Sequence, residues 1–103
     1  MLPPGPPVPR LTAVSDGVNL LSGHIVYSRT VKLFLEELAA PERLEVRLDG
    51  AAIPDLDLFC TDPVNQSYEA NFHLSDSVTI GWHAVEIRVG SRVFPPVGID
   101  VRA

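Results

Sequence analysis

Three carboxylates lie close together in the sequence, at Asp55, Asp57 and Asp62. Carboxylate oxygens are the ligands that Ca²⁺ takes in proteins, so these residues are weak candidates for a metal site. The run Ile53–Asp62 lacks the glycine and the closing glutamate of an EF-hand loop, and apolar residues interrupt it. The competing interpretation is a strand edge or connection with solvated carboxylates. We therefore assign no metal and no other cofactor to the chain.

Cys60 could act as a nucleophile if His73 or His83 served as its base. No glycine-rich elbow, flanking cation or C-x-x-C partner surrounds it in the sequence. Free cysteine is usually a small buried hydrophobe, so we expect Cys60 to be buried and without a catalytic role. The sequence therefore does not indicate an enzyme.

The histidines His24, His73 and His83 do not have the close spacing of a zinc motif. His83 shares the strand parity of the apolar residues that follow it, so we expect a half-buried side chain bonded to backbone. His73 alternates with apolar neighbours on the opposite face, so we expect it to be solvated.

Trp82 is the strongest candidate for a binding residue. Strand parity points it away from Val85 and Ile87, and exposed aromatic side chains stack on sugars or pack in protein interfaces. Tyr27 and Phe34 are expected on outer faces as well. The interpretation that we favour over exposure is that Trp82 caps the end of the core, because tryptophan is rarely left fully exposed.

Apolar and polar residues alternate with a period of two in four runs, 44–48, 68–74, 85–89 and 97–102. This period is typical of strands with one buried and one solvated face. Asp16-Gly17, Asp49-Gly50 and Gly90-Ser91 fit tight turns between such runs. The pattern predicts an all-β fold of about seven to eight short antiparallel strands, arranged as a β-sandwich or a small barrel. The inward positions predict this core: Leu11, Ala13, Ile25, Val31, Leu33, Leu35, Leu44, Val46, Leu48, Tyr68, Ala70, Phe72, Val85, Ile87, Val89, Val97, Ile99 and Val101.

The segment Val31–Ala40 could be read either as a strand or as a helix. Val31, Leu33 and Leu35 fit a strand face, whereas the residues after Leu35 are good helix formers. We expect a strand to about Leu35, then one helical turn that ends before Pro41.

The run Gly81–Val89, GWHAVEIRV, resembles the penultimate strand of bacterial immunoglobulin-like domains. In these domains a short glycine-containing turn and a final strand ending in V-x-V follow, as Val97–Val101 does here. The opening Pro9–Val14 is similar to their proline-led first strand. There is no Cys…Trp…Cys arrangement, and His83 stands where a tyrosine corner would place tyrosine. The resemblance implies an immunoglobulin-like β-sandwich that serves as a spacer, an accessory domain beside an enzyme or a binding module on a surface protein.

The chain has 103 residues, a formal net charge of −5 and one cysteine. One domain fits this length, and an acidic balance gives no basic surface for nucleic acid or an anionic membrane. Residues 1–9 include five prolines, which favour an extended spacer. The alternatives are a disordered start of a free-standing protein and a polyproline ligand for a recognition domain. We therefore predict a proline-rich linker at 1–9 and an immunoglobulin-like domain at 10–103. No signal peptide or transmembrane segment is evident, and the compartment stays open.

Together these patterns favour a non-catalytic immunoglobulin-like accessory or spacer domain of a larger bacterial protein. Its expected partners are an upstream domain of the same protein and a second copy, paired through an exposed edge strand. The alternative is a carbohydrate-binding module appended to a carbohydrate-active or surface protein. That alternative requires Trp82 or Tyr68 on a flat or grooved patch beside Asp or Asn side chains.

Overall fold

The computed structural model describes residues 9–18 and 24–103 of the chain. The described part is nearly all β, with ten strands and one short 3₁₀ helix, η1 (Pro41–Arg43). The predicted linker at 1–9 lies outside the described residues except for Pro9.

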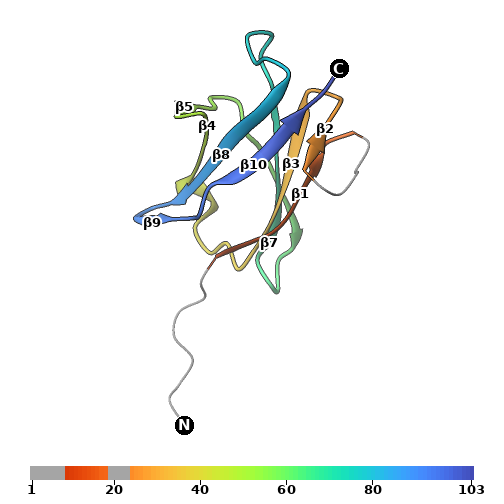
Figure 1. Cartoon of the computed structure of the whole chain (residues 1–103). Helices are drawn as coiled ribbons and strands as arrows, with labels where there is room; N and C mark the ends of the chain where they lie inside the picture. The colour runs from red at the N-terminus through yellow and green to blue at the C-terminus, as the bar shows by residue number, and fades with distance from the viewer. Residues whose placement is uncertain (1–8, 19–23) are drawn as a thin grey trace.

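The strands form two sheets. Sheet A has four strands in the order β1-β3-β7-β6, namely β1 (Arg10–Asp16), β3 (Thr30–Glu36), β7 (Ser67–His73) and β6 (Asp57–Asp62). Sheet B has six, in the order β2-β10-β8-β4-β5 with β9 also beside β8: β2 (Ile25–Val26), β10 (Val97–Val101), β8 (Gly81–Val89), β4 (Leu44–Leu48), β5 (Ala51–Ala52) and β9 (Arg92–Val93). Figure 1 shows β8 and β10 in one layer and β1, β3 and β7 in the other.

One cluster of buried side chains fills the space between the sheets. It draws Leu33 and Phe72 from sheet A and Val85, Ile87 and Ile99 from sheet B, each at most 2% exposed. Alternation explains this, because successive side chains of a strand point to opposite faces. Two sheets around a shared core are compatible with a β-sandwich, and the all-β prediction is confirmed at this level.

The predicted turns at Asp49-Gly50 and Gly90-Ser91 are confirmed, since they join β4 to β5 and β8 to β9. Asp49, Gly50 and Gly90 all have positive φ, at 51°, 86° and 59°. Such values are costly for most residues but readily adopted by glycine and tolerated by aspartate.

The expected helical turn before Pro41 is wrong. β3 continues to Glu36, and the 3₁₀ helix begins at Pro41 instead. The N–H groups of Glu37 and Leu38 donate to the carbonyls of Asn65 and Gln66, at 3.2 and 3.0 Å. These bonds to the turn between β6 and β7 replace the bonds to preceding residues that a helix would need.

The parity of the first strand also differs from the prediction. Leu11 pairs with Leu35, but Ala13 pairs with Phe34, so the register shifts by one residue between them. This bulge turns Ala13 to solvent and buries Val14. The predicted core is otherwise correct in outline, although Ile25 is only half-buried beside the fully buried Val26.

Two further differences concern strand count and direction. The described residues form ten strands rather than about seven to eight, and three of these, β2, β5 and β9, have only two residues each. β2 runs parallel to β10, so the sheets are not wholly antiparallel. Leu38, Leu74 and Phe94 join the core from loops, where period-two alternation makes no prediction.

Candidate functional site

Trp82 lies on the outer face of sheet B and is 70% exposed. Val85 and Ile87 on the same strand are buried, as the parity argument requires. The parity argument that Trp82 points outward is confirmed, and the favoured interpretation of a core cap is wrong. The reason is position: Trp82 is the second residue of β8, on the face turned away from sheet A.

A glycine allows the indole to lie against the backbone of the neighbouring strand. A Cβ atom placed on Gly98 would lie 3.4 Å from Cε3 and Cζ3 of Trp82. One part of the ring therefore contacts β10 at Gly98, and the rest of the ring is left to solvent. His24 further supports this stretch of β10, because its Nδ1 lies 2.9 Å from the Gly98 carbonyl oxygen.

An ion pair lies beside Trp82. Asp100 is the cross-strand partner of Trp82, and its Oδ2 accepts from Nη2 and Nε of Arg102 at 2.7 and 2.8 Å. Asp100 is 8% exposed, whereas the Arg102 side chain is half exposed. The Asp100 carboxylate, helped by Tyr27, raises the pKa of the Arg102 guanidinium above its usual value.

Tyr27 follows β2 on the far side of β10. Asp100 pairs with both Trp82 and Ile25, so the three strands place these residues in a row. Val26 and Val101 are fully buried, which directs their strand neighbours outward. We call this outer surface the Trp82 face and define it by six residues: Ile25, Tyr27, Trp82, Gly98, Asp100 and Arg102.

A buried carboxylate holds the backbone at Tyr27. Asp16 is fully buried at the end of β1. Its Oδ2 accepts from the N–H groups of Tyr27 and Ser28 at 2.7 and 2.8 Å. Its Oδ1 accepts from the Ser28 hydroxyl at 2.6 Å and the Val18 N–H at 2.9 Å. Sheet A thereby fixes the edge of the Trp82 face in sheet B.

The other predicted binding aromatic is elsewhere. Phe34 lies on β3 in sheet A and is half-buried, so it does not join Trp82. Tyr27 is 43% exposed and does join it. Alternation in β10 could have placed Asp100 and Arg102 on an outer face, but no local signal shows that they lie beside Trp82.

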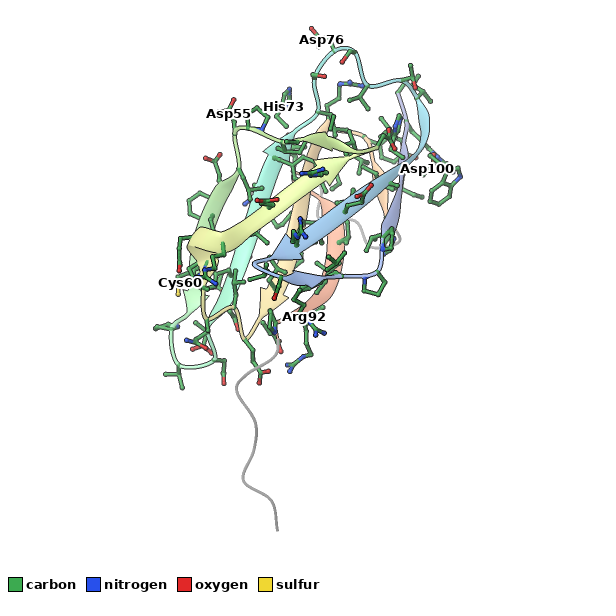
Figure 2. The ribbon with its side chains drawn as sticks, turned by 90° about the vertical axis from the view of Figure 1, so that its left-hand side faces the viewer. Asp55, Cys60, His73, Asp76, Arg92 and Asp100 are labelled. Carbon is green, nitrogen blue, oxygen red and sulfur yellow. The ribbon has the colours of Figure 1, made fainter. Side chains whose placement is uncertain are left out.

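A cavity of about 530 Å³ opens at one end of the two sheets, between the β4–β5 turn and the segment that follows β7. Its walls are mostly apolar, and the polar residues that line it include Asp49, Asp55, His73 and His83. Figure 2 shows Asp55 and His73 at the same end of the molecule. His73 is exposed as predicted, and its Nδ1 lies 3.3 Å from the Thr30 hydroxyl.

His83 links two parts of this cavity wall. Its Nδ1 lies 2.5 Å from Asp49 Oδ2, and its Nε2 lies 2.7 Å from the Thr79 carbonyl oxygen. Both partners only accept, so the two bonds together require the doubly protonated imidazolium. The Asp49 carboxylate, with the Thr79 carbonyl, raises the pKa of His83, while His83 and the Ala84 N–H lower the pKa of Asp49. The predicted half-buried, backbone-bonded histidine is confirmed.

The weak calcium candidates are not brought together. In residues 9–18 and 24–103, no three His, Cys, Asp or Glu side chains are grouped so that they could hold a metal ion. Asp62 instead closes the turn after β6: it accepts from the N–H groups of Val64 and Asn65, and the Asn65 amide lowers its pKa. Asp55 and Asp57 are exposed.

Cys60 is free and exposed, contrary to the expectation of burial. It lies on β6, which is the edge of sheet A, and pairs with Tyr68. His73 is five residues further along β7, or about 17 Å at the rise of a strand. Figure 2 shows Cys60 well away from His73, and His83 belongs to the other sheet. Neither proposed base is therefore in reach.

The described residues contain no helix long and apolar enough to cross a membrane. Comparison of the chain with protein-family models, curated proteins and solved structures finds no match.

Proposed function

We propose that the chain is a non-catalytic immunoglobulin-like β-sandwich, an accessory or spacer domain whose Trp82 face contacts another domain or subunit. Strand order supports the immunoglobulin-like assignment. The order β1-β3-β7-β6 corresponds to A-B-E-D, and β10-β8-β4 corresponds to G-F-C, of that fold. Figure 1 also supports a spacer, because β1 begins at one end of the molecule and β10 ends at the other.

His83 supports the same assignment. In immunoglobulin domains a tyrosine near the start of strand F bonds to the backbone a few residues upstream. His83 is near the start of β8 and bonds to the carbonyl of Thr79, four residues earlier. An imidazolium thus makes the local connection that a tyrosine hydroxyl makes elsewhere.

The observation that carries the contact function is the exposure of Trp82 at 70%. A large aromatic side chain left in water forgoes the free energy of burial that a partner would restore. Tryptophan and arginine are also enriched among the residues that dominate binding energy, and Arg102 is two residues from the cross-strand partner of Trp82.

The polar groups support a non-catalytic role. Both nitrogens of His83 and both oxygens of Asp49 are engaged in hydrogen bonds within the fold. Cys60 has no base beside it, for the reasons given above.

The stability of Trp82→Ala tests the proposal. The ring is 70% exposed, so three-tenths of its surface is covered; that is roughly 75 Å² and about 2 kcal/mol at most. We therefore expect the variant to lower the free energy of unfolding by less than about 2 kcal/mol, compared with 3–5 kcal/mol for a core aromatic. Phe59→Ala, at an exposed aromatic on sheet A, is the matched control. A core-like loss for Trp82→Ala would show a structural residue and contradict the proposal.

Carbohydrate binding is the second candidate, favoured by the polar pair Asp100–Arg102 beside an exposed indole. Trp82 is the only tryptophan, so its fluorescence reports this face alone. Titration with a panel of oligosaccharides separates the two functions. A saturable change in emission would favour the carbohydrate module, and no response at exposed Trp82 supports the protein contact.

A further inference from the structure

We infer that the Trp82 face binds the proline-rich segment of a second copy of this chain. The inference rests on the proposed contact function of this face and names its partner. Residues 1–8 lie outside the described part of the chain, and their sequence together with Pro9 holds three overlapping P-x-x-P spacings, Pro3–Pro6, Pro4–Pro7 and Pro6–Pro9. Such spacings dock on aromatic surfaces as polyproline II helices, which are already extended and so lose little entropy on binding.

The spacing of the exposed aromatics fits such a helix. Trp82 and Ile25 lie two strand separations apart across β10, and Tyr27 is two residues beyond Ile25. Strand geometry therefore puts the Cα atoms of Trp82 and Tyr27 about 12 Å apart. One turn of polyproline II, from Pro4 to Pro7, spans about 9 Å. The remaining difference, about 3 Å, is the rise of roughly one further residue of the helix.

The hydrogen-bonding groups also match. A polyproline II helix has carbonyl oxygens without internal partners and few N–H groups. The Trp82 face offers the complementary donors, the indole N–H of Trp82 and the half-exposed guanidinium of Arg102. Residues 1–9 carry no charged side chain. The two acidic copies, each with a net charge of −5, can therefore meet at this contact without side-chain charges of the segment repelling the face.

Chain stiffness favours a second copy over the same copy. Pro9 lines a shallow groove with Val97, the first residue of β10, and Arg10 already belongs to β1. To reach its own Trp82 face, the segment would have to reverse direction between Pro7 and Arg10. Val8 precedes a proline and is restricted to extended conformations, and proline itself has a fixed φ. A tight reversal is therefore unfavourable, which favours the face of a second copy over the face of the same chain.

The segment is joined to β1 at one end of the domain, whereas the Trp82 face lies near the other end (Figure 1). The contact therefore joins two different surfaces of the two copies, which makes it heterologous. Heterologous contacts extend head to tail, whereas a symmetric pairing of edge strands stops at the dimer. In sedimentation, we therefore expect the average mass of the native chain to rise beyond the dimer with concentration.

Two complementary variants test the contact. The receiver contains Pro4→Ser, Pro6→Ser and Pro7→Ser and keeps Trp82. The donor contains Trp82→Ala, keeps its prolines and has no tryptophan, so excitation at the red edge detects only the receiver. Addition of donor should shift Trp82 emission to the blue and lower its acrylamide quenching constant at least about twofold, because one ring face already contacts Gly98. A donor that combines all four substitutions is the control and should change nothing.

Three outcomes would overturn the inference. The first is an unchanged Trp82 signal up to about 1 mM donor, a concentration at which even weak contacts form. The second is an equal response to the control donor. The third is that acrylamide quenches Trp82 poorly in the dilute native chain but efficiently in the receiver, which would place the segment on its own domain.

If Trp82→Ala does not fold, a peptide of residues 1–10 replaces the donor. If acrylamide quenches Trp82 of the receiver but the donor does not change its signal, only this inference is contradicted. If Trp82 of the dilute receiver is already protected from acrylamide, the proposed function is contradicted as well.

Discussion

Asp16→Ala should be among the most damaging single substitutions in this domain. The carboxylate is fully buried and accepts from the N–H groups of Val18, Tyr27 and Ser28 and from the Ser28 hydroxyl, all at 2.6–2.9 Å. These donors belong to the segment that connects β1 to β3 across the edge of sheet B. Alanine would leave all of them without this acceptor.

The magnitude follows from those bonds. A buried donor that loses its partner costs about 1–3 kcal/mol, and water that enters the site recovers part of the cost. We expect Asp16→Ala to lower the free energy of unfolding by about 3–5 kcal/mol, out of a total of about 5–15 kcal/mol for a domain. The midpoint of thermal unfolding should fall by at least about 12 °C. Asp16→Asn keeps one acceptor oxygen but turns an NH₂ group toward backbone donors, so its loss should be smaller and still clear.

Urea unfolding followed by circular dichroism measures this loss. Asp76→Ala is the control, because Asp76 is an exposed aspartate in the turn after β7 (Figure 2) and should change stability by less than about 0.5 kcal/mol. A loss below about 1 kcal/mol for Asp16→Ala would refute the argument that this carboxylate holds the segment. Because Tyr27 is one of the donors, the folded fraction of the variant should also show weaker contacts at the Trp82 face.

The pair His83–Asp49 should make the free energy of unfolding depend on pH both in the acidic range and above pH 6.5. The raised pKa of His83 adds stability that is fully present below pH 6.5 and is lost as the pH rises through the pKa of the folded state. The lowered pKa of Asp49 adds stability that is present above pH 3.8 and is lost as the pH falls through the pKa of the folded state. In unfolding curves measured at a series of pH values, His83→Gln should abolish the loss of stability that the native protein shows as the pH rises. An unchanged loss would argue against a protonated His83. Gly98→Val should push the indole off β10, because even a Cβ atom would lie 3.4 Å from the ring; we expect stronger acrylamide quenching of Trp82 and a stability loss below about 2 kcal/mol. Cys60 should react fully with a thiol reagent in the native state, since it is exposed on an edge strand, and slow reaction limited by unfolding would contradict that placement.

Some of the candidate site could be predicted from the sequence and some could not. The outward orientation of Trp82 followed from parity with Val85, because the two residues belong to one strand of regular geometry. The exposure of Cys60 did not follow, because a strand in the middle of a sheet and one at its edge have the same alternation. β6 has a neighbour on one side only, and this is a property of the whole sheet.

The bulge in β1 shows a second limit. The alternation of Leu11 and Ala13 predicts one continuous inward face, yet the extra residue between them reverses the parity of all that follows. Val14 and Asp16 are buried as a result. Nothing in these seven residues alone signals the shift, because it arises from pairing with β3 and from the donors that Asp16 meets.

The sequence by itself determined which residues alternate, where Asp49-Gly50 and Gly90 turn the chain, and which face of each long strand is apolar. These are local properties, since they depend on covalent geometry and on the φ angles that single residues tolerate. Only the tertiary structure decided that Trp82 lies on Gly98 beside Asp100 and two strand separations from Ile25, across β10. Those partners come from strands far apart in the sequence, and their pairing is set by how all the strands together bury one core.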